Sequence, residues 1–192
     1  MTSEGYRTVQ DVVQDICRRA EKENFEDGVS SGFTEALDVF LKARGRLVIT
    51  SLGWLILCEE INQGVAAEAL RWLGRLDHEE SYKIRYRILC ICLYDDSLFI
   101  RDAALLGIAS LGDPSAIPHL ESAKLSTESE ELCGDIAQVI EHLTEIDRQR
   151  QELGVESDIV VRMPIYFRRA KFKVRHSDPV KPRFVGDNLP EE

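Results

Sequence analysis

Residues 96–120 read DSLFIRDAALLGIASLGDPSAIPHL. Apolar residues recur at helical spacing through the first half of this stretch, and the pattern predicts a helix over 97–111. Asp113 followed by Pro114 is a typical helix start, because Asp accepts hydrogen bonds from the first N–H groups and proline has no N–H to leave unsatisfied. The stretch therefore predicts a second helix over 114–124, joined to the first by a tight turn.

The same helical pattern extends over most of the chain. Helices separated by polar or glycine-containing breaks are predicted at 8–23, 33–43, 46–62, 65–76, 80–94, 97–111, 114–124 and 127–152. The last of them is expected to start after Ser126 and to end at Gly154. Helices with short connections and no strand between them predict an all-α fold.

Internal repetition links these helices to one another. A shift of 35 residues aligns Ala69 with Ala104, Leu70 with Leu105, Leu73 with Ile108 and Leu76 with Leu111. A shift of 33 in the other direction aligns Ala36, Leu37 and Phe40 with Ala69, Leu70 and Leu73. Small and apolar residues at this spacing form the inner face of a helix, and one unit cannot bury such a face alone. The repetition therefore predicts a stack of similar units.

Residues 96–120 resemble a short HEAT-like, armadillo-type helical repeat. The resemblance rests on Arg101 ahead of an alanine-rich helix, on Leu-Gly-Asp-Pro at 111–114 and on Ile-Pro-x-Leu at 117–120. It is weaker over 63–77, which lacks the Gly-Asp-Pro turn. Members of this family are mostly non-catalytic scaffolds that bind partners, although phycobilin lyases are tied to chemistry and a related all-helical group excises alkylated DNA bases.

The resemblance implies an α-solenoid of stacked antiparallel helix pairs. We therefore expect an N-terminal helix and polar turn over 1–32, HEAT-like repeats over 33–154, and a basic, extended, non-helical or strand-like tail over 155–192. The resemblance also implies that Arg101 braces the loop before its helix by bonding to an acidic residue such as Asp96.

Charge is distributed unevenly along the chain, whose net charge is −10. Residues 1–159 contain 16 Lys and Arg against 30 Asp and Glu, whereas residues 160–192 contain 8 against 4. An acidic body repels phosphate, which argues against a body that wraps DNA, and it favours a basic protein as partner.

The tail carries the opposite charge. As a strand, residues 166–175 place Ala170, Phe172 and Val174 on one face and basic side chains on the other, and a helix with poorer separation is the alternative. The candidate binding residues are Arg168, Arg169, Lys171, Phe172, Lys173 and Arg175. Such a segment can grip RNA or single-stranded DNA by phosphate contacts and stacking. It can also fold back on the acidic body, which we favour because that surface is always at hand.

Two further candidate surfaces lie in the body. An acidic stripe on the last predicted helix consists of Glu131, Asp135, His142 and Glu145, with an ordinary solvated face as the alternative. The helix predicted over 65–76 supplies Arg71, Trp72 and Arg75. Trp72 could stack against a flat ligand, but a core tryptophan between two repeats is the interpretation that we favour.

Signatures of catalysis are missing from the sequence. It contains no GxGxxG, GxxxxGK, GxSxG or HExxH motif, its four histidines are scattered, and its five cysteines include no CxxC pair. We expect reduced, buried thiols, no metal, no cofactor and no catalytic residue. The first thirty residues are too acidic for a signal peptide and no apolar run is long enough to span a membrane, so we expect a cytoplasmic protein with no membrane partner.

Together these patterns predict a non-catalytic adaptor or inhibitor that binds a basic protein, as an immunity protein or antitoxin does. One alternative is a nucleic-acid-binding protein that uses its tail. A second alternative is a lyase-like protein that acts on a bound flat ligand.

Overall fold

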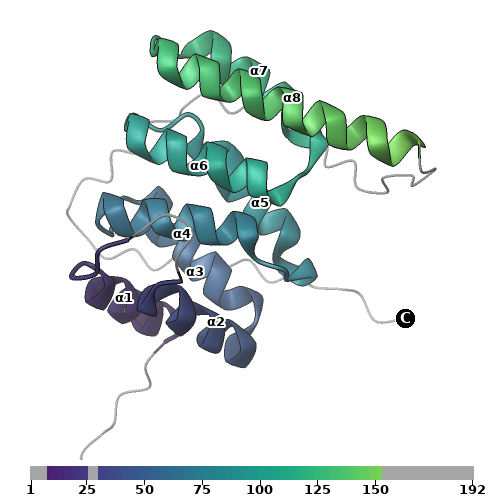
Figure 1. The fold of residues 1–192 in the computed structure, drawn as a ribbon. Helices are drawn as coiled ribbons and strands as arrows, with labels where there is room; N and C mark the ends of the chain where they lie inside the picture. The colour runs from purple at the N-terminus through teal and green to yellow at the C-terminus, as the bar shows by residue number, and fades with distance from the viewer. Residues whose placement is uncertain (1–7, 26–29, 153–192) are drawn as a thin grey trace, which may run out of the picture. The chain divides into compact units, whose positions relative to one another are not determined.

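The computed structural model describes residues 8–25 and 30–152, which form eight α-helices and no β-strand (Figure 1). The helices are α1 (Val9–Ala20), α2 (Gly32–Arg44), α3 (Arg46–Leu57), α4 (Gln63–Arg75), α5 (Tyr82–Cys92), α6 (Leu98–Leu111), α7 (Ile117–Ser126) and α8 (Glu130–Glu152). Two 3-10 turns, η1 (Glu79–Ser81) and η2 (Pro114–Ala116), precede α5 and α7. The predicted all-α fold class is confirmed. The predicted tail and the predicted helix end at Gly154 lie outside the described residues.

The helices are arranged in two layers of successive pairs (Figure 1). In one layer α1 contacts α3 and α3 contacts α5, and in the other α4 contacts α6 and α6 contacts α8. Between the layers α1 contacts α2, α5 contacts α6, and α7 contacts α8. Because the connections are short, the two helices of a pair run antiparallel. This is the solenoid-like stack that the repetition predicted.

Local capping explains where the helices in the second half of the chain begin. Asp113 accepts a hydrogen bond from the backbone N–H of Ser115 at 2.9 Å, as predicted, although the first turn is 3-10 and α7 starts only at Ile117. The prediction that α8 starts after Ser126 is wrong, because α7 includes that residue. Ser129 accepts from the N–H of Leu132 at 3.3 Å and so caps α8, which begins three residues later than predicted.

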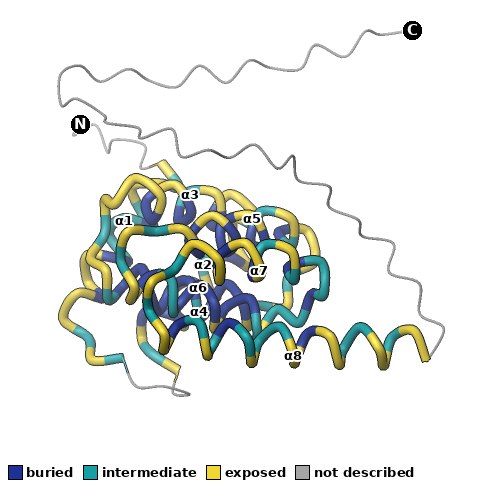
Figure 2. The backbone as a smooth tube through the Cα atoms, turned by 90° about the horizontal axis from the view of Figure 1, so that it is seen from above, coloured by how far each residue is buried: buried dark blue, intermediate teal, exposed yellow. Residues whose placement is uncertain are grey.

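Helix α4 lies in the middle of the stack (Figure 1), and nine of its 13 residues are buried. Figure 2 shows where buried residues gather in the stack as a whole. Its closest neighbour is α6, because both helices have a glycine at the point where they meet. A Cβ atom built on Gly74 would lie 2.2 Å from the carbonyl oxygen of Gly107, and one built on Gly107 would lie 2.7 Å from the carbonyl oxygen of Leu70. The two backbones are therefore in direct contact, which no larger residue allows.

A buried arginine holds the connection between α4 and α5. The Arg85 side chain is 3% exposed. Its guanidinium donates to the carbonyl oxygens of Leu73 at 2.7 Å and His78 at 3.3 Å, and to the Ser81 hydroxyl at 3.2 Å. The bond to Leu73 satisfies a carbonyl in the last turn of α4, where carbonyls have no partner within the helix, and the other two bonds hold the connection that follows.

Two other arginines donate to backbone carbonyls in the second half of the stack. Arg101 Nε donates to the carbonyl oxygen of Leu93 at 3.0 Å, and Arg150 Nη2 donates to that of Gly112 at 3.1 Å. The resemblance implied that Arg101 braces the loop before α6 by bonding to an acidic side chain. In the structure, Arg101 bonds to the backbone carbonyl oxygen of Leu93 in this loop region.

The cysteines are reduced, and most of them are buried as expected. Cys17, Cys90 and Cys92 are buried, and burial raises the pKa of each thiol to about 12, so all three are protonated at neutral pH. The expectation of burial is wrong for Cys58, which is exposed at the end of α3. None of the helices described in the structure is long and apolar enough to cross a membrane.

Candidate partner-binding surfaces

The acidic stripe predicted on the last helix lies on α8. Glu131, His142 and Glu145 are exposed, and Asp135 is half-buried. The helix contacts α6, α7 and η2 through a buried stripe that includes Leu132, Ile136 and Leu143. Over residues 130–147 of α8 the chain contains six Asp and Glu and no Lys or Arg. This part of α8 therefore presents negative charge on the side that faces away from its helix neighbours.

Glu145 differs from the rest of this stripe because a basic residue of its own helix binds it. Arg148 contacts the Glu145 carboxylate at 2.7 Å and 2.9 Å and also bonds to Glu152. Hydrogen bonds from Arg148 and then Gln149 lower the pKa of the Glu145 carboxyl to about 2. The sequence did not reveal this pairing, and it leaves less of the Glu145 charge available to a partner than the helical spacing suggested.

The three candidate residues of α4 are held mainly by neighbours in the protein. Trp72 is 4% exposed, and its indole N–H donates to Asp38 of α2 at 2.9 Å. Arg71 and Arg75 each contact the buried carboxylate of Glu68 at 3.1 Å. Trp72 therefore occupies the core position that we favoured over ligand stacking, whereas the two arginines reach the surface in part.

We expect Trp72→Phe to lower the free energy of unfolding by about 2 kcal/mol, because it removes a hydrogen bond to a carboxylate and leaves a small void. Asp38→Asn is the matched control, since it keeps an oxygen acceptor, and should cost less than about 1 kcal/mol. Urea unfolding followed by far-UV circular dichroism measures both. If Trp72→Phe leaves stability unaltered, the ring is not a structural part of the stack.

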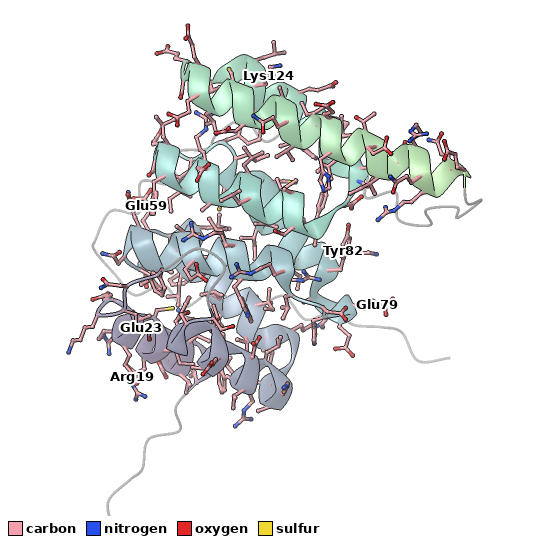
Figure 3. All side chains as sticks on the ribbon, viewed as in Figure 1. Arg19, Glu23, Glu59, Glu79, Tyr82 and Lys124 are labelled. Atoms are coloured by element: carbon pink, nitrogen blue, oxygen red, sulfur yellow. The ribbon has the colours of Figure 1, made fainter. Side chains whose placement is uncertain are left out.

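A hollow of about 450 Å³ opens between the α1–α2 connection and the outward faces of α4 and α6. Its lining residues are Glu23, Asn24, Phe25, Gly64, Arg71, Phe99, Asp102 and Leu106. Figure 3 shows Glu23, which is labelled there, beside α1. Of this set only Arg71 was among the predicted binding residues. Phe99 and Leu106 lie seven positions apart on α6 and are both exposed, but their exposure, like that of Leu98, is seen only in the structure.

The residues from the α1–α2 connection that line the hollow are fixed to the first turn of α2. The Glu23 carboxylate accepts a hydrogen bond from the N–H of Phe33 at 3.1 Å. The rings of Phe25 and Phe33 lie 6.0 Å apart in a tilted arrangement. The rim of the hollow is thus pre-formed, which reduces the entropy that a ligand would lose by ordering it.

The histidines and acidic residues of the described part of the chain do not gather into a metal-binding group. No group of three His, Cys, Asp or Glu side chains there is placed to hold a metal ion. His119 lies edge-on to the Tyr86 ring at 6.2 Å, and burial lowers its pKa, while His142 is exposed on α8. His176 and the six candidate residues of the tail lie outside the described residues.

The stack of helix pairs places the described residues in the class of all-α, solenoid-like folds. Comparison with known families matches residues 100–126, which include most of α6 and all of α7, to the family described as PBS lyase HEAT-like repeat. This part of the chain is therefore similar to a HEAT-like repeat, as the resemblance implied, and repeats of this kind often serve in protein interaction. Searches of the curated proteins and of the solved structures found no match.

Proposed function

We propose that the protein is a non-catalytic, cytoplasmic adaptor or inhibitor that binds and masks a basic protein. The observation that carries this proposal is the surface of α8, where residues 130–147 offer six carboxylates and no Lys or Arg. A surface of one charge raises the association rate with an oppositely charged protein and disfavours partners of like charge. Masking a basic protein, as an immunity protein or antitoxin does, requires an acidic surface of this kind.

The structure suggests which residues of α8 to alter. Glu131 and Glu141 are exposed, Asp135 is half-buried, and all three lie before the part of the helix in which Arg148 compensates Glu145. Reversing these three charges alters the acidic surface of α8 without breaking the ion pairs of Arg148 with Glu145 and Glu152. Reversing Glu145 would also disturb an intrahelical network, so its effect on binding would be harder to interpret.

We expect Glu131→Lys/Asp135→Lys/Glu141→Lys to weaken binding of a basic partner by roughly tenfold or more, because charged surfaces steer association. The partner is first captured from native lysate and purified, and its affinity is then measured by titration at two salt concentrations. Wild-type affinity should fall as salt rises, and that of the triple variant should depend on salt much less. Reversal of three exposed residues elsewhere, Glu59, Glu60 and Glu79, controls for net charge. If the affinity for the partner changes neither with the salt concentration nor with the triple reversal, the proposal is contradicted.

The basic tail provides a second arm of the same titration. If residues 160–192 cover the acidic body, a form that ends at residue 157 should bind the basic partner more tightly than the full chain. If the tail adds a strand to the partner, the shortened form should lose binding. Binding of single-stranded nucleic acid that disappears with the tail would favour the nucleic-acid alternative instead.

A further inference from the structure

We propose that the outer face of α3 and α5 is a self-association surface, through which two copies of the chain form a two-fold symmetric dimer. The surface has an apolar patch at its centre, an acidic border at one end and a basic border at the other. Helices α3 and α5 belong to one layer of the stack and α8 belongs to the other, so this surface is separate from the acidic surface of α8. The apolar patch consists of Trp54, Leu57, Ile91 and Tyr94.

The four residues of the apolar patch lie on the same side of their layer. A Cβ atom built on Gly53 would lie 2.4 Å from Cδ1 of Ile88, so these two residues mark the seam between α3 and α5. The two helices run in the same direction, because α4 runs back between them. Each helical residue is turned by about 100° from the one before it, which brings the patch residues to the outer side of the seam. Leu57 and Ile91 each follow a seam residue by about one turn, so they lie at the same level.

The apolar patch is exposed to solvent. The exposed fraction is 43% for Trp54, 45% for Leu57 and 37% for both Ile91 and Tyr94. The Tyr94 hydroxyl donates to the carbonyl oxygen of His119 in α7 at 3.1 Å, which holds its ring at the edge of the patch. Neighbouring exposed apolar residues that include a tryptophan and a tyrosine are typical of a protein interface, because their burial removes a large apolar area from water.

The acidic border consists of Glu59 and Glu60, which follow α3 and are exposed. Their backbone N–H groups donate to the carbonyl oxygens of Ile56 at 3.1 Å and Leu55 at 2.9 Å, so both residues are fixed to the last turn of α3. Within the described ranges, no hydrogen bond or ion pair reaches either carboxylate. Glu59 has a φ of 57°, in the left-handed region that favours glycine. A glutamate at such a position indicates that its carboxylate has a role.

The basic border consists of Arg87 and Lys83 of α5. Arg87 lies one residue before the seam residue Ile88, on the outer side of the helix, and it is exposed. Lys83 precedes it by about one turn and is also exposed. Neither cation bonds to another residue in the part of the chain that the structure describes. The exposed Glu79 and Glu80 lie before α5, further from the patch than Lys83. The charge next to the patch therefore changes from positive on α5 to negative at the end of α3.

This order of charges favours a second copy over a partner of uniform charge. In a two-fold symmetric dimer each surface faces its own image. An axis that crosses the apolar patch midway between Arg87 and Glu59 places Arg87 of each copy against the acidic border of the other, and the contact occurs twice. A basic partner would be repelled by Arg87 and an acidic partner by Glu59 and Glu60, whereas a second copy satisfies both borders.

Sedimentation velocity of the full chain over about 1 to 200 μM tests for the dimer. The expected result is a reversible monomer–dimer equilibrium with a Kd on the order of 10 μM, because four apolar side chains form a small interface. Tryptophan fluorescence gives a local readout. The chain has two tryptophans, and Trp72 is 4% exposed, so a change in emission on dilution reports on Trp54. The emission maximum should shift to shorter wavelength as the dimer forms and Trp54 leaves water.

Charge variants test the symmetry of the contact. Arg87→Glu and Glu59→Arg/Glu60→Arg should each weaken self-association by roughly tenfold or more, because each replaces two attractive contacts with two repulsive ones. An equimolar mixture of the two variants should dimerise again, since both contacts then join opposite charges. Lys42→Glu, at an exposed residue of α2, changes the net charge by the same amount as Arg87→Glu and should dimerise as the wild type does.

A substitution in the patch separates apolar burial from charge. Leu57→Ser should weaken self-association by roughly tenfold, because it removes apolar area at the centre of the surface. Its matched control is Leu125→Ser, at a leucine of α7 that is 91% exposed and lies outside the patch, and it should leave the dimer unaltered. Circular dichroism confirms that each variant is folded.

Three results would overturn the inference: a monomer at every concentration, a dimer that none of the charge and patch variants weakens, or a mixture of the two charge variants that stays monomeric. The dimer and the proposed function fail separately. A monomeric chain that still binds a basic partner through α8 overturns the dimer alone. A dimer whose affinity for the partner changes neither with salt nor with the reversal of charges on α8 overturns the proposed function alone.

Discussion

Gly74→Ala is expected to lower the free energy of unfolding by roughly 3 kcal/mol, as a severe case of overpacking in a close-packed interior. The added Cβ would lie 2.2 Å from the Gly107 carbonyl oxygen and 2.5 Å from its Cα atom. Both are backbone atoms, so no side-chain rotation relieves the clash, and α4 and α6 must separate. Because α4 lies at the centre of the stack, the separation would loosen the contacts of α4 with both layers.

Alanine substitutions at two other glycines serve as controls for Gly74→Ala. A Cβ on Gly134, in α8, meets no atom within 4 Å, so Gly134→Ala should stabilise the protein by up to about 1 kcal/mol through helix propensity. A Cβ on Gly53 meets only the side chain of Ile88, which can move, so Gly53→Ala should fall between the two. Urea unfolding of the three variants gives the order of their free energies of unfolding. Equal stability of Gly74→Ala and Gly134→Ala would mean that the two helices are not in backbone contact.

Arg85→Ala is expected to lower the free energy of unfolding by about 3 kcal/mol, because it removes three hydrogen bonds and leaves the buried carbonyl oxygen of Leu73 without the guanidinium donor. The carbonyl oxygens of Leu73 and His78 and the Ser81 hydroxyl all bond to this guanidinium. Burial lowers the pKa of Arg85 below its ordinary value. The shift shows that desolvation of the charge opposes folding, and the three hydrogen bonds offset it.

The choice of substitution separates charge from geometry. Arg85→Lys keeps the positive charge but cannot place donors on three acceptors at once, so we expect it to lose about half as much stability as Arg85→Ala. Arg87→Ala, at an exposed residue of the same helix, is the matched control and should change stability by less than about 0.5 kcal/mol. Thermal and urea unfolding measure all three. A stable Arg85→Ala variant would show that water replaces the guanidinium.

Most of the helices could be predicted because their signals are local. The periodic apolar residues of α4 and α6, and the turn at Asp113 and Pro114, act within a few residues of one another and need no tertiary partner. The start of α8 was predicted wrongly for a related reason. Ser126 and Ser129 are both suitable caps, and the choice depends on how far α7 extends, which tertiary packing influences.

The candidate binding residues were harder to predict because they depend on which helices meet. The acidic stripe of α8 followed from spacing within one helix, but its compensation by Arg148 depends on the side-chain geometry that α8 adopts. The hollow could not be foreseen, since its lining comes from three segments that only the fold brings together. The core position of Trp72 depends on Asp38 of α2, which accepts a hydrogen bond from the indole N–H and lies 34 positions away in the sequence.

The sequence by itself determined that this protein is a stack of helical repeats with an acidic body, because periodicity, capping and charge are properties of neighbouring residues. The tertiary structure decided which glycines must remain glycine, which arginines are structural, and where a pre-formed hollow exists. The glycine contact and the hollow depend on residues about 30 or more positions apart, such as Gly74 and Gly107 or Glu23 and Asp102, and Arg85 bonds to Leu73, which lies 12 positions away in another helix. Such distances follow from how helices pack, and helix packing is set by many side chains acting together rather than by any single motif.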